Sequence, residues 1–240
     1  MKRIDGRAYD ELRAIRITSG VQRFAEGSAL IELGKTRVLC AASVEERVPA
    51  FLRKSGGGWI TAEYAMLPRA TVTRTPRASA TGRIGGRSQE IQRFIGRSLR
   101  AVADLDALGE RTIVLDCDVL QADGGTRTAA VTGAYVALHQ ALENLANMGV
   151  ISSIPLKSGV AAISVGIVHG YMLLDLCYDE DFNAAVDFNV VMTGKGEFVE
   201  VQGTAEGKPF SRETIDDLLS LGDKGIKQLF QAQQAALKKG

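Results

Sequence analysis

Hydrophobic and polar residues alternate along the first 45 residues of the chain, in short runs that glycines separate. A period of two is typical of β-strands. The pattern predicts strands over four ranges, which are 12–18, 21–25, 28–33 and 36–44. The Gly34-Lys35 pair before the fourth range indicates a hairpin turn.

Two later segments repeat their hydrophobic residues every three to four positions, which predicts amphipathic helices. The first covers 88–105, and the second, 128–147, is rich in alanine and should be well buried. Between them, RTIVLDCDVLQ (111–121) alternates and predicts a strand. A last helix should begin at Ser211, with Glu213 and Thr214 in its first turn.

The segment between the second helix and the last one has strand patterns again. Residues 160–168 and 171–178 predict one hairpin, and residues 184–193 and 197–205 predict another. The whole order predicts an α+β fold in which helices pack on mixed sheets. Residues 54–86 instead predict a long loop, and a loop of that length is usually functional or ordered by a partner.

The composition is that of an ordinary globular protein, with 45% hydrophobic and 24% charged residues among 240. The N-terminal segment MKRIDGRAYDELR lacks the apolar core of a signal peptide, and no run is long enough to span a membrane. Cys40, Cys117 and Cys177 lie singly in apolar runs. We therefore expect buried, reduced thiols in a cytoplasmic protein.

The net charge is only +1, but arginines are concentrated in one part of the chain. Eight of them accompany a single acid, Glu90, between residues 69 and 100; they are Arg69, Arg74, Arg77, Arg83, Arg87, Arg93, Arg97 and Arg100. Because guanidinium groups match phosphate oxygens, this run indicates a polyanionic partner. A solvated basic face paired with acids elsewhere is the simpler alternative.

The stretch QADGGTRTA (121–129) joins a predicted strand to a predicted helix. A helix N-terminus offers free N–H groups, and glycines allow the backbone to approach an anion closely. Arg127 adds a guanidinium, Thr126 and Thr128 add hydroxyl donors, and Asp123 is the natural N-cap. These features suit a phosphate-like anion. A tight turn that leaves Arg127 on the surface fits the same residues equally well.

The same arrangement occurs where the first predicted helix begins. There Gly85-Gly86 is followed directly by Arg87. If both helices rest on one sheet, their N-termini can face a single pocket. Arg87 and Arg127 would then bind one anion between them.

Acidic residues that can complete such a site occur in YDEDFNAAVDFN (178–189). A separation of six residues across a bend can bring Asp181 and Asp187 side by side. Adjacent carboxylates either bind a divalent cation or retain a proton for general acid catalysis. A solvated acidic turn is the alternative, although Asp187 lies in an apolar strand where an unpaired carboxylate is costly. Together with the anion site and the arginines, the pair suits phosphoryl transfer on a polyanionic substrate.

At these residues the chain resembles a known family, that of ribonuclease PH. The resemblance covers most of the chain in order, through GVQRFAEGSALIELGKTRVLCAAS, GGRSQEIQRFIGRSLR, DCDVLQADGGTRTAAVTGAYVAL and YDEDFNAAVDFNVVMTGKGEFVEVQGTAEGKPFSRE. It implies one domain over 1–240 with the mixed-sheet fold of ribosomal protein S5 domain 2. Cys177 and Phe182-Asn183 depart from the family pattern, which has an acid and small residues there.

The resemblance also implies an activity, that of a phosphate-dependent 3′→5′ exoribonuclease. Such an enzyme reversibly trims 3′ ends of tRNA precursors and releases nucleoside diphosphates. The family's phosphate-binding positions fall on Arg87, Gly125, Thr126 and Arg127. Its catalytic and metal-binding acids fall on Asp181 and Asp187, with Mg²⁺ or Mn²⁺.

The resemblance further implies a hexamer built as a trimer of dimers, with the arginine-rich run along the RNA path. We expect RNA to bind at Arg69, Arg74, Arg77, Arg93 and Arg97. The alternative is a catalytically silent RNA-binding subunit of an exosome-like ring. A third possibility, an enzyme acting on a small phosphorylated molecule, would leave the arginine run without a role.

Overall fold

The computed structural model describes residues 3–77, 82 and 85–238, and contains two β-sheets. The larger sheet has the strand order β1-β2-β3-β5-β4, and the smaller has the order β7-β6-β8-β9. The strands of the larger sheet are β1 (Ile15–Ser19), β2 (Gly27–Leu33), β3 (Thr36–Glu45), β4 (Trp59–Met66) and β5 (Thr112–Gln121). Those of the smaller sheet are β6 (Val160–Val168), β7 (Tyr171–Leu174), β8 (Ala184–Thr193) and β9 (Phe198–Ala205).

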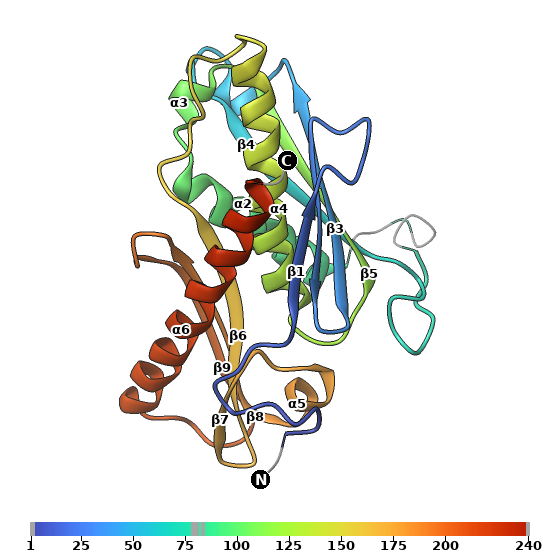
Figure 1. The fold of residues 1–240 in the computed structure, drawn as a ribbon, viewed down its shortest axis with the longest axis vertical. Coiled ribbons are helices and arrows are strands. Elements are labelled where there is room, and N and C mark those ends of the chain that lie inside the picture. The colour runs from blue at the N-terminus through green and yellow to red at the C-terminus, as the bar shows by residue number, and fades with distance from the viewer. Residues whose placement is uncertain (1–2, 78–81, 83–84, 239–240) are drawn as a thin grey trace.

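Helices pack on and between these sheets. They are α2 (Gly86–Val102), α3 (Leu105–Leu108), α4 (Thr126–Asn147), α5 (Tyr178–Phe182) and α6 (Arg212–Leu237), with a 3₁₀ turn over Ala50–Leu52. The central helix α4 contacts β2 and β3 on one side and β6 on the other, and α2 packs beside it against β4 (Figure 1). The α+β class predicted from the sequence is therefore confirmed.

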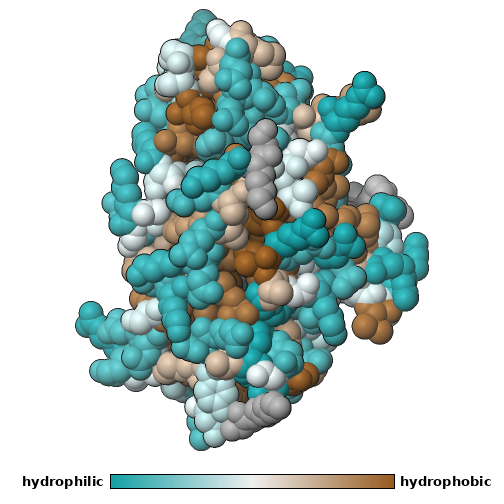
Figure 2. Space-filling view, viewed as in Figure 1, coloured by the Kyte–Doolittle hydropathy of each residue, from teal (hydrophilic) through white to brown (hydrophobic). Residues whose placement is uncertain are grey.

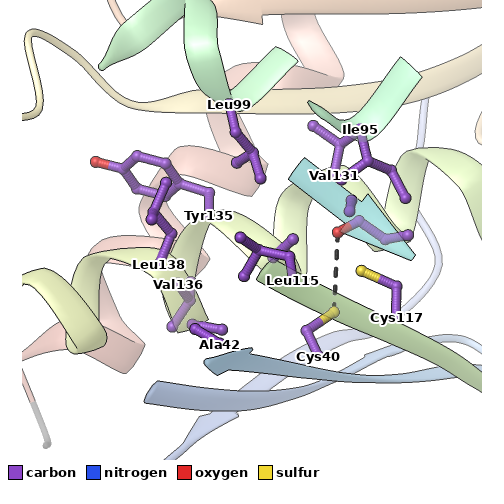
Figure 3. Close-up of a cluster of buried hydrophobic side chains, with 14 of the residues drawn as sticks. Cys40, Ala42, Ile95, Leu99, Leu115, Cys117, Val131, Tyr135, Val136 and Leu138 are labelled. Atoms are coloured by element: carbon purple, nitrogen blue, oxygen red, sulfur yellow. Dashed lines mark hydrogen bonds between the residues drawn. The ribbon is translucent and has the colours of Figure 1, made fainter. Parts of the chain in front are cut away.

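The largest hydrophobic cluster lies between the five-stranded sheet and the helices α2 and α4. Its members include Cys40 and Ala42 from β3, Leu115 and Cys117 from β5, Ile95 and Leu99 from α2, and Val131 and Leu138 from α4 (Figure 3). Gly133 lets α4 approach the sheet, because a Cβ there would lie 2.8 Å from Ile31 Cγ2. The three cysteines are free and buried, as the sequence predicts.

Four expected elements differ from the observed structure. Residues 21–25 form no strand, and the expected loop 54–86 contains the strand β4, which pairs in parallel with β5. The strand expected to reach residue 178 ends at Leu174, and the short helix α5 follows it. The first long helix begins at Gly86 and ends at Val102, before the separate turn of α3.

The face of the molecule drawn in Figure 2 is largely polar. Hydrophilic residues cover most of the face in Figure 2, and smaller hydrophobic patches interrupt them. Within the described part of the chain, no helix is both long and apolar enough to cross a membrane.

Candidate active site

The glycines before α4 have a backbone that other residues cannot easily adopt. Gly124 and Gly125 both have positive φ angles, of 75° and 65°. A Cβ on Gly124 would lie 2.5 Å from the carbonyl oxygen of Leu176. The N-cap residue of α4 is Gly125, so the expectation that Asp123 caps this helix is wrong. Asp123 instead accepts a hydrogen bond from the backbone N–H of Tyr178 at 3.4 Å.

The carbonyl groups of this turn are held from one side. Thr36 Oγ1 donates to the carbonyl oxygen of Gly124 at 2.7 Å, and Arg13 donates to the carbonyl oxygens of Asp123 and Gly124. In a trans peptide the carbonyl and the next N–H point in opposite directions. The N–H groups of Gly124 and Gly125 therefore point away from Arg13, and neither has an acceptor among the described residues. Such free N–H groups can bind an anion.

Arg13 is itself fixed by a buried ion pair. Its Nη2 lies 2.6 Å from Asp175 Oδ1 and its Nε lies 2.9 Å from Asp175 Oδ2. The two side chains are 4% and 0% exposed. Asp175 also accepts from the backbone N–H of Arg13 at 2.8 Å and has a positive φ of 54°. This pair connects the N-terminal segment, the turn before α4 and the end of β7.

The structure brings the arginines from the two helix starts to the same acids. Arg87 follows the first residue of α2, and Arg127 is the second residue of α4. Burial raises the pKa of Asp181 and of Asp187, and the charges of Arg87 and Arg127 oppose that rise at both carboxyl groups. Arg127 Nη1 also donates to Gln202 Oε1 at 3.0 Å and to Glu90 Oε1 at 3.2 Å.

Asp181 from α5 and Asp187 from β8 line one open hollow of about 570 Å³. Burial raises the pKa of both carboxyl groups, and the nearby arginines only partly oppose it. The charge of Asp181 raises the pKa of Asp187 further. A carboxylate whose charge is disfavoured by a second carboxylate suits either a bound cation or a shared proton.

Two residues of this region, Tyr64 and Arg13, were not predicted from the sequence. Tyr64 Oη and Thr126 Oγ1 share a hydrogen bond of 2.8 Å, and the charges of Arg87 and Arg127 act on the tyrosine. Burial raises the pKa of this tyrosine hydroxyl. The alternation in WITAEYAM, after three glycines, was the signal that could have revealed β4. Arg13 gave no such signal because its partner Asp175 is 162 residues away.

The threonine hydroxyl groups near the expected anion site already form hydrogen bonds within the protein. Thr128 is buried, and its Oγ1 donates to the carbonyl oxygen of Gly125 at 2.9 Å. The expectation that Thr128 donates to the anion is therefore wrong. Thr126 keeps its place beside the free N–H groups, with its hydroxyl bonded to that of Tyr64.

The other arginines of the run occupy different environments. Arg69, Arg74 and Arg77 are exposed on the segment that follows β4, which extends beyond the five-stranded sheet (Figure 1). On α2, Arg93 is exposed, whereas Arg97 pairs with Glu200 at 2.6 Å. The last two of the eight are Arg100, whose guanidinium lies over the ring of Trp59, and Arg83, which is outside the described residues.

Comparison with known proteins defines the class to which this fold and site belong. The models of the 3′ exoribonuclease family match the chain in two parts, domain 1 over residues 11–142 and domain 2 over residues 159–225. The chain therefore belongs to the 3′ exoribonuclease family.

Individual relatives are similar over almost their whole length. The chain is 62% identical over 234 residues to Ribonuclease PH of Dehalococcoides mccartyi, which covers 98% of this chain and 97% of that protein. It is 57% identical over 237 residues to Ribonuclease PH of Syntrophomonas wolfei, with 99% of each covered. The chain is accordingly a phosphorolytic 3′→5′ exoribonuclease, an enzyme of the nucleotidyltransferase type that uses phosphate as co-substrate.

Solved structures with the same fold are more distant in sequence. An Archaeoglobus fulgidus exosome chain, solved with RNA bound to the active site, matches with a TM-score of 0.82 at 24% identity, covering 96% of this chain and 92% of that one. Rice (Oryza sativa) Rrp46 matches with a TM-score of 0.79 at 21% identity, covering 98% and 100%. These matches confirm the mixed-sheet fold predicted from the sequence.

Proposed function

We propose that this exoribonuclease trims the 3′ ends of tRNA precursors, with inorganic phosphate bound where α4 begins. One observation carries the assignment of the site. Gly124 lies against the backbone of Cys177 and Tyr178, where the helix that carries Asp181 begins. The charges of Arg87 and Arg127 act on both Asp181 and Asp187. Anion donors and carboxylates thus occupy adjacent parts of one site.

The residues have distinct roles in the reaction. A phosphate oxygen forms a bond to the phosphorus of the last phosphodiester, and the bond from that phosphorus to the 3′ oxygen of the preceding nucleotide breaks. The terminal nucleotide leaves as a nucleoside diphosphate, and the 3′ oxygen takes up a proton. Arg87 and Arg127 reduce the charge repulsion between the inorganic phosphate and the phosphodiester, and the peptide N–H groups hold the attacking phosphate in place.

Asp181 and Asp187 act at the departing 3′ oxygen. The described residues contain no group of three or more His, Cys, Asp or Glu side chains arranged to bind a metal. Two carboxylates nevertheless fit Mg²⁺, which commonly takes one or two carboxylates and completes its shell with water and substrate phosphates. Bound there, Mg²⁺ or Mn²⁺ would neutralise charge that develops on the leaving oxygen.

The exposed arginines bind the rest of the RNA in this proposal. Arg69, Arg74 and Arg77 have no acidic partner within hydrogen-bonding distance among the described residues, and Arg93 is exposed on α2. Arg97 must exchange Glu200 for a phosphate to contribute. Exposed guanidinium groups contact the RNA backbone and make its affinity dependent on salt.

We also propose that the chain acts as one 240-residue unit in a cytoplasmic hexamer, a trimer of dimers. The shared core supports the single unit, since the largest hydrophobic cluster includes Ala29 and Ile31 from the first sheet and Val160 and Val191 from the second. Sedimentation of the purified protein tests the hexamer, because six copies of a 25.7 kDa chain are readily distinguished from two.

The function is tested with a tRNA that carries a short 3′ extension. We expect shortening only when inorganic phosphate is present, with nucleoside diphosphates as products. Asp187→Asn should abolish trimming, whereas Asp179→Asn, an exposed residue of the same short helix, should leave it intact. Nucleoside monophosphates formed without phosphate would contradict the reaction.

Two further results would contradict parts of the proposal. Full activity of Asp187→Asn would show that the acidic pair is wrongly assigned. Strong RNA binding by the unmodified protein without any trimming would instead favour the silent ring subunit.

A further inference from the structure

The short helix α5 presents two aromatic rings to solvent beside the acidic pair. Tyr178 is 57% exposed and Phe182 is 77% exposed. Their rings lie four residues apart on one face of the helix, with centroids 6.2 Å apart and planes inclined by 29°. Exposing two stacked rings to water is unfavourable in free energy, and a ligand or partner that covers them would remove that cost.

The helix that carries these rings is firmly held. Glu180 is buried and receives hydrogen bonds from Arg3 at 2.7 and 2.8 Å and from the backbone N–H of Cys177 at 3.1 Å. Asn183 Nδ2 closes the other end by donating to the carbonyl oxygen of Asp179 at 2.7 Å. The rings are therefore presented from a fixed support.

Phe182 lines the same hollow as Asp181 and Asp187. Glu206 is the other charged side chain that lines this hollow, and none of the described arginines or lysines does. Without a cation such a lining repels backbone phosphate. A neutral, flat group that can stack on an aromatic ring fits the hollow better.

We propose that Phe182, supported by Tyr178, is a stacking platform for a nucleobase at the 3′ end of the RNA. The inference rests on the exoribonuclease activity and adds a subsite to it. Stacking on an aromatic ring accepts every base, since each has a flat π-face. That tolerance suits an enzyme that removes nucleotides one after another from ends of varied sequence.

The first test compares Phe182→Ala with Phe182→Trp in the full-length protein. Loss of one stacking contact should raise the KM for RNA about tenfold, and the KM for phosphate should stay the same. Phe182→Trp should restore a KM near that of the unmodified protein. Phe24→Ala is the matched control, since Phe24 is 91% exposed in the loop before β2 and should change neither constant.

The second test removes the base from the RNA instead of the ring from the protein. Substrates with one abasic nucleotide, at each of the last three positions in turn, are compared for the unmodified protein and Phe182→Ala. At one position the abasic RNA should raise the KM of the unmodified protein to that of the variant. The KM of the variant should not rise further with the same abasic RNA. That non-additivity identifies which nucleotide is stacked.

Three results would overturn the platform. The first is an unchanged KM for RNA in Phe182→Ala, and the second is an equal loss at every abasic position in both proteins. The third is a smaller assembly of Phe182→Ala by sedimentation, which would assign the rings to a contact between copies of the chain. The unmodified protein should still trim RNA in a phosphate-dependent way in all three cases, so failure of the platform is distinguishable from failure of the proposed function.

Discussion

Two consecutive glycines lie at the start of both α2 and α4, but the two starts differ in structure. Arginine follows the glycines directly at α2, whereas threonine and then arginine follow them at α4. At α4 both glycines have positive φ angles, and a Cβ on Gly124 would collide with the backbone of Leu176 and Cys177. At α2, Gly85 is extended, and a Cβ on Gly85 or Gly86 would meet nothing within 4 Å among the described residues. Only the α4 turn requires glycine.

This difference indicates which half of the proposed phosphate site has a fixed conformation before phosphate binds. The α4 turn packs against the backbone of Leu176 and Cys177, and Arg13 and Thr36 fix its carbonyl groups. Arg87, in contrast, stands on an exposed first turn. We infer that α4 supplies the fixed N–H donors, whereas α2 contributes mainly a charge.

The largest effect is expected from Arg13→Ala, which removes support from the α4 turn and not from the start of α2. Asp175 would stay buried with Arg7 as its one remaining ion-pair partner, 3.5 Å away, so the substitution should cost up to about 3–5 kcal/mol of unfolding free energy. Denaturant titration measures this loss. Arg47→Ala is the control, because its ion pair with Glu45 is exposed and should not affect stability measurably. An Arg13→Ala protein as stable as the unmodified one would show that the buried pair does not support the turn.

The glycines allow a direct comparison of the two helix starts. Gly124→Ala should lose about 2–4 kcal/mol of stability, from a left-handed alanine and a backbone collision, and should impair phosphate use. Gly86→Ala should be neutral or slightly stabilising, because alanine favours a helix and has room there. Thermal unfolding measures the stability of each variant, and the KM for phosphate measures its use of phosphate. Equal effects of the two substitutions would remove the distinction drawn above.

The smallest effects, and the most specific, are expected from the arginines. Arg87→Ala and Arg127→Ala should each raise the KM for phosphate by about tenfold or more, the value of a charge-assisted hydrogen bond. Arg74→Ala should leave that constant unchanged and reduce the salt dependence of RNA binding by about one contact. If every arginine variant changed both measures equally, the division between phosphate and RNA sites would be wrong.

Sequence analysis predicted most of the elements from local patterns. The alternation in β2, β3 and β5 and the helical period of α2 show which faces are buried, because each pattern depends only on neighbours in the chain. The alanine-rich sequence of α4 indicates a helix that is buried over most of its length. It failed at β4, where three glycines and two prolines around the strand obscured a regular alternation in WITAEYAM. It also failed at α5, which is only five residues long and depends on Arg3, 177 residues away from Glu180.

The sequence by itself determined the chemical content of the site: two glycine-rich helix starts, two arginines and two aspartates, on elements whose type can be read from local periodicity. The tertiary structure decided how these groups combine. Packing of α2 and α4 on one sheet brings Arg87 and Arg127 to the aspartates, and burial shifts the pKa of both carboxyl groups upward. Arg13, Tyr64 and Phe182 acquire their positions through partners or surfaces distant in sequence, and such contacts depend on the whole fold and leave no local pattern.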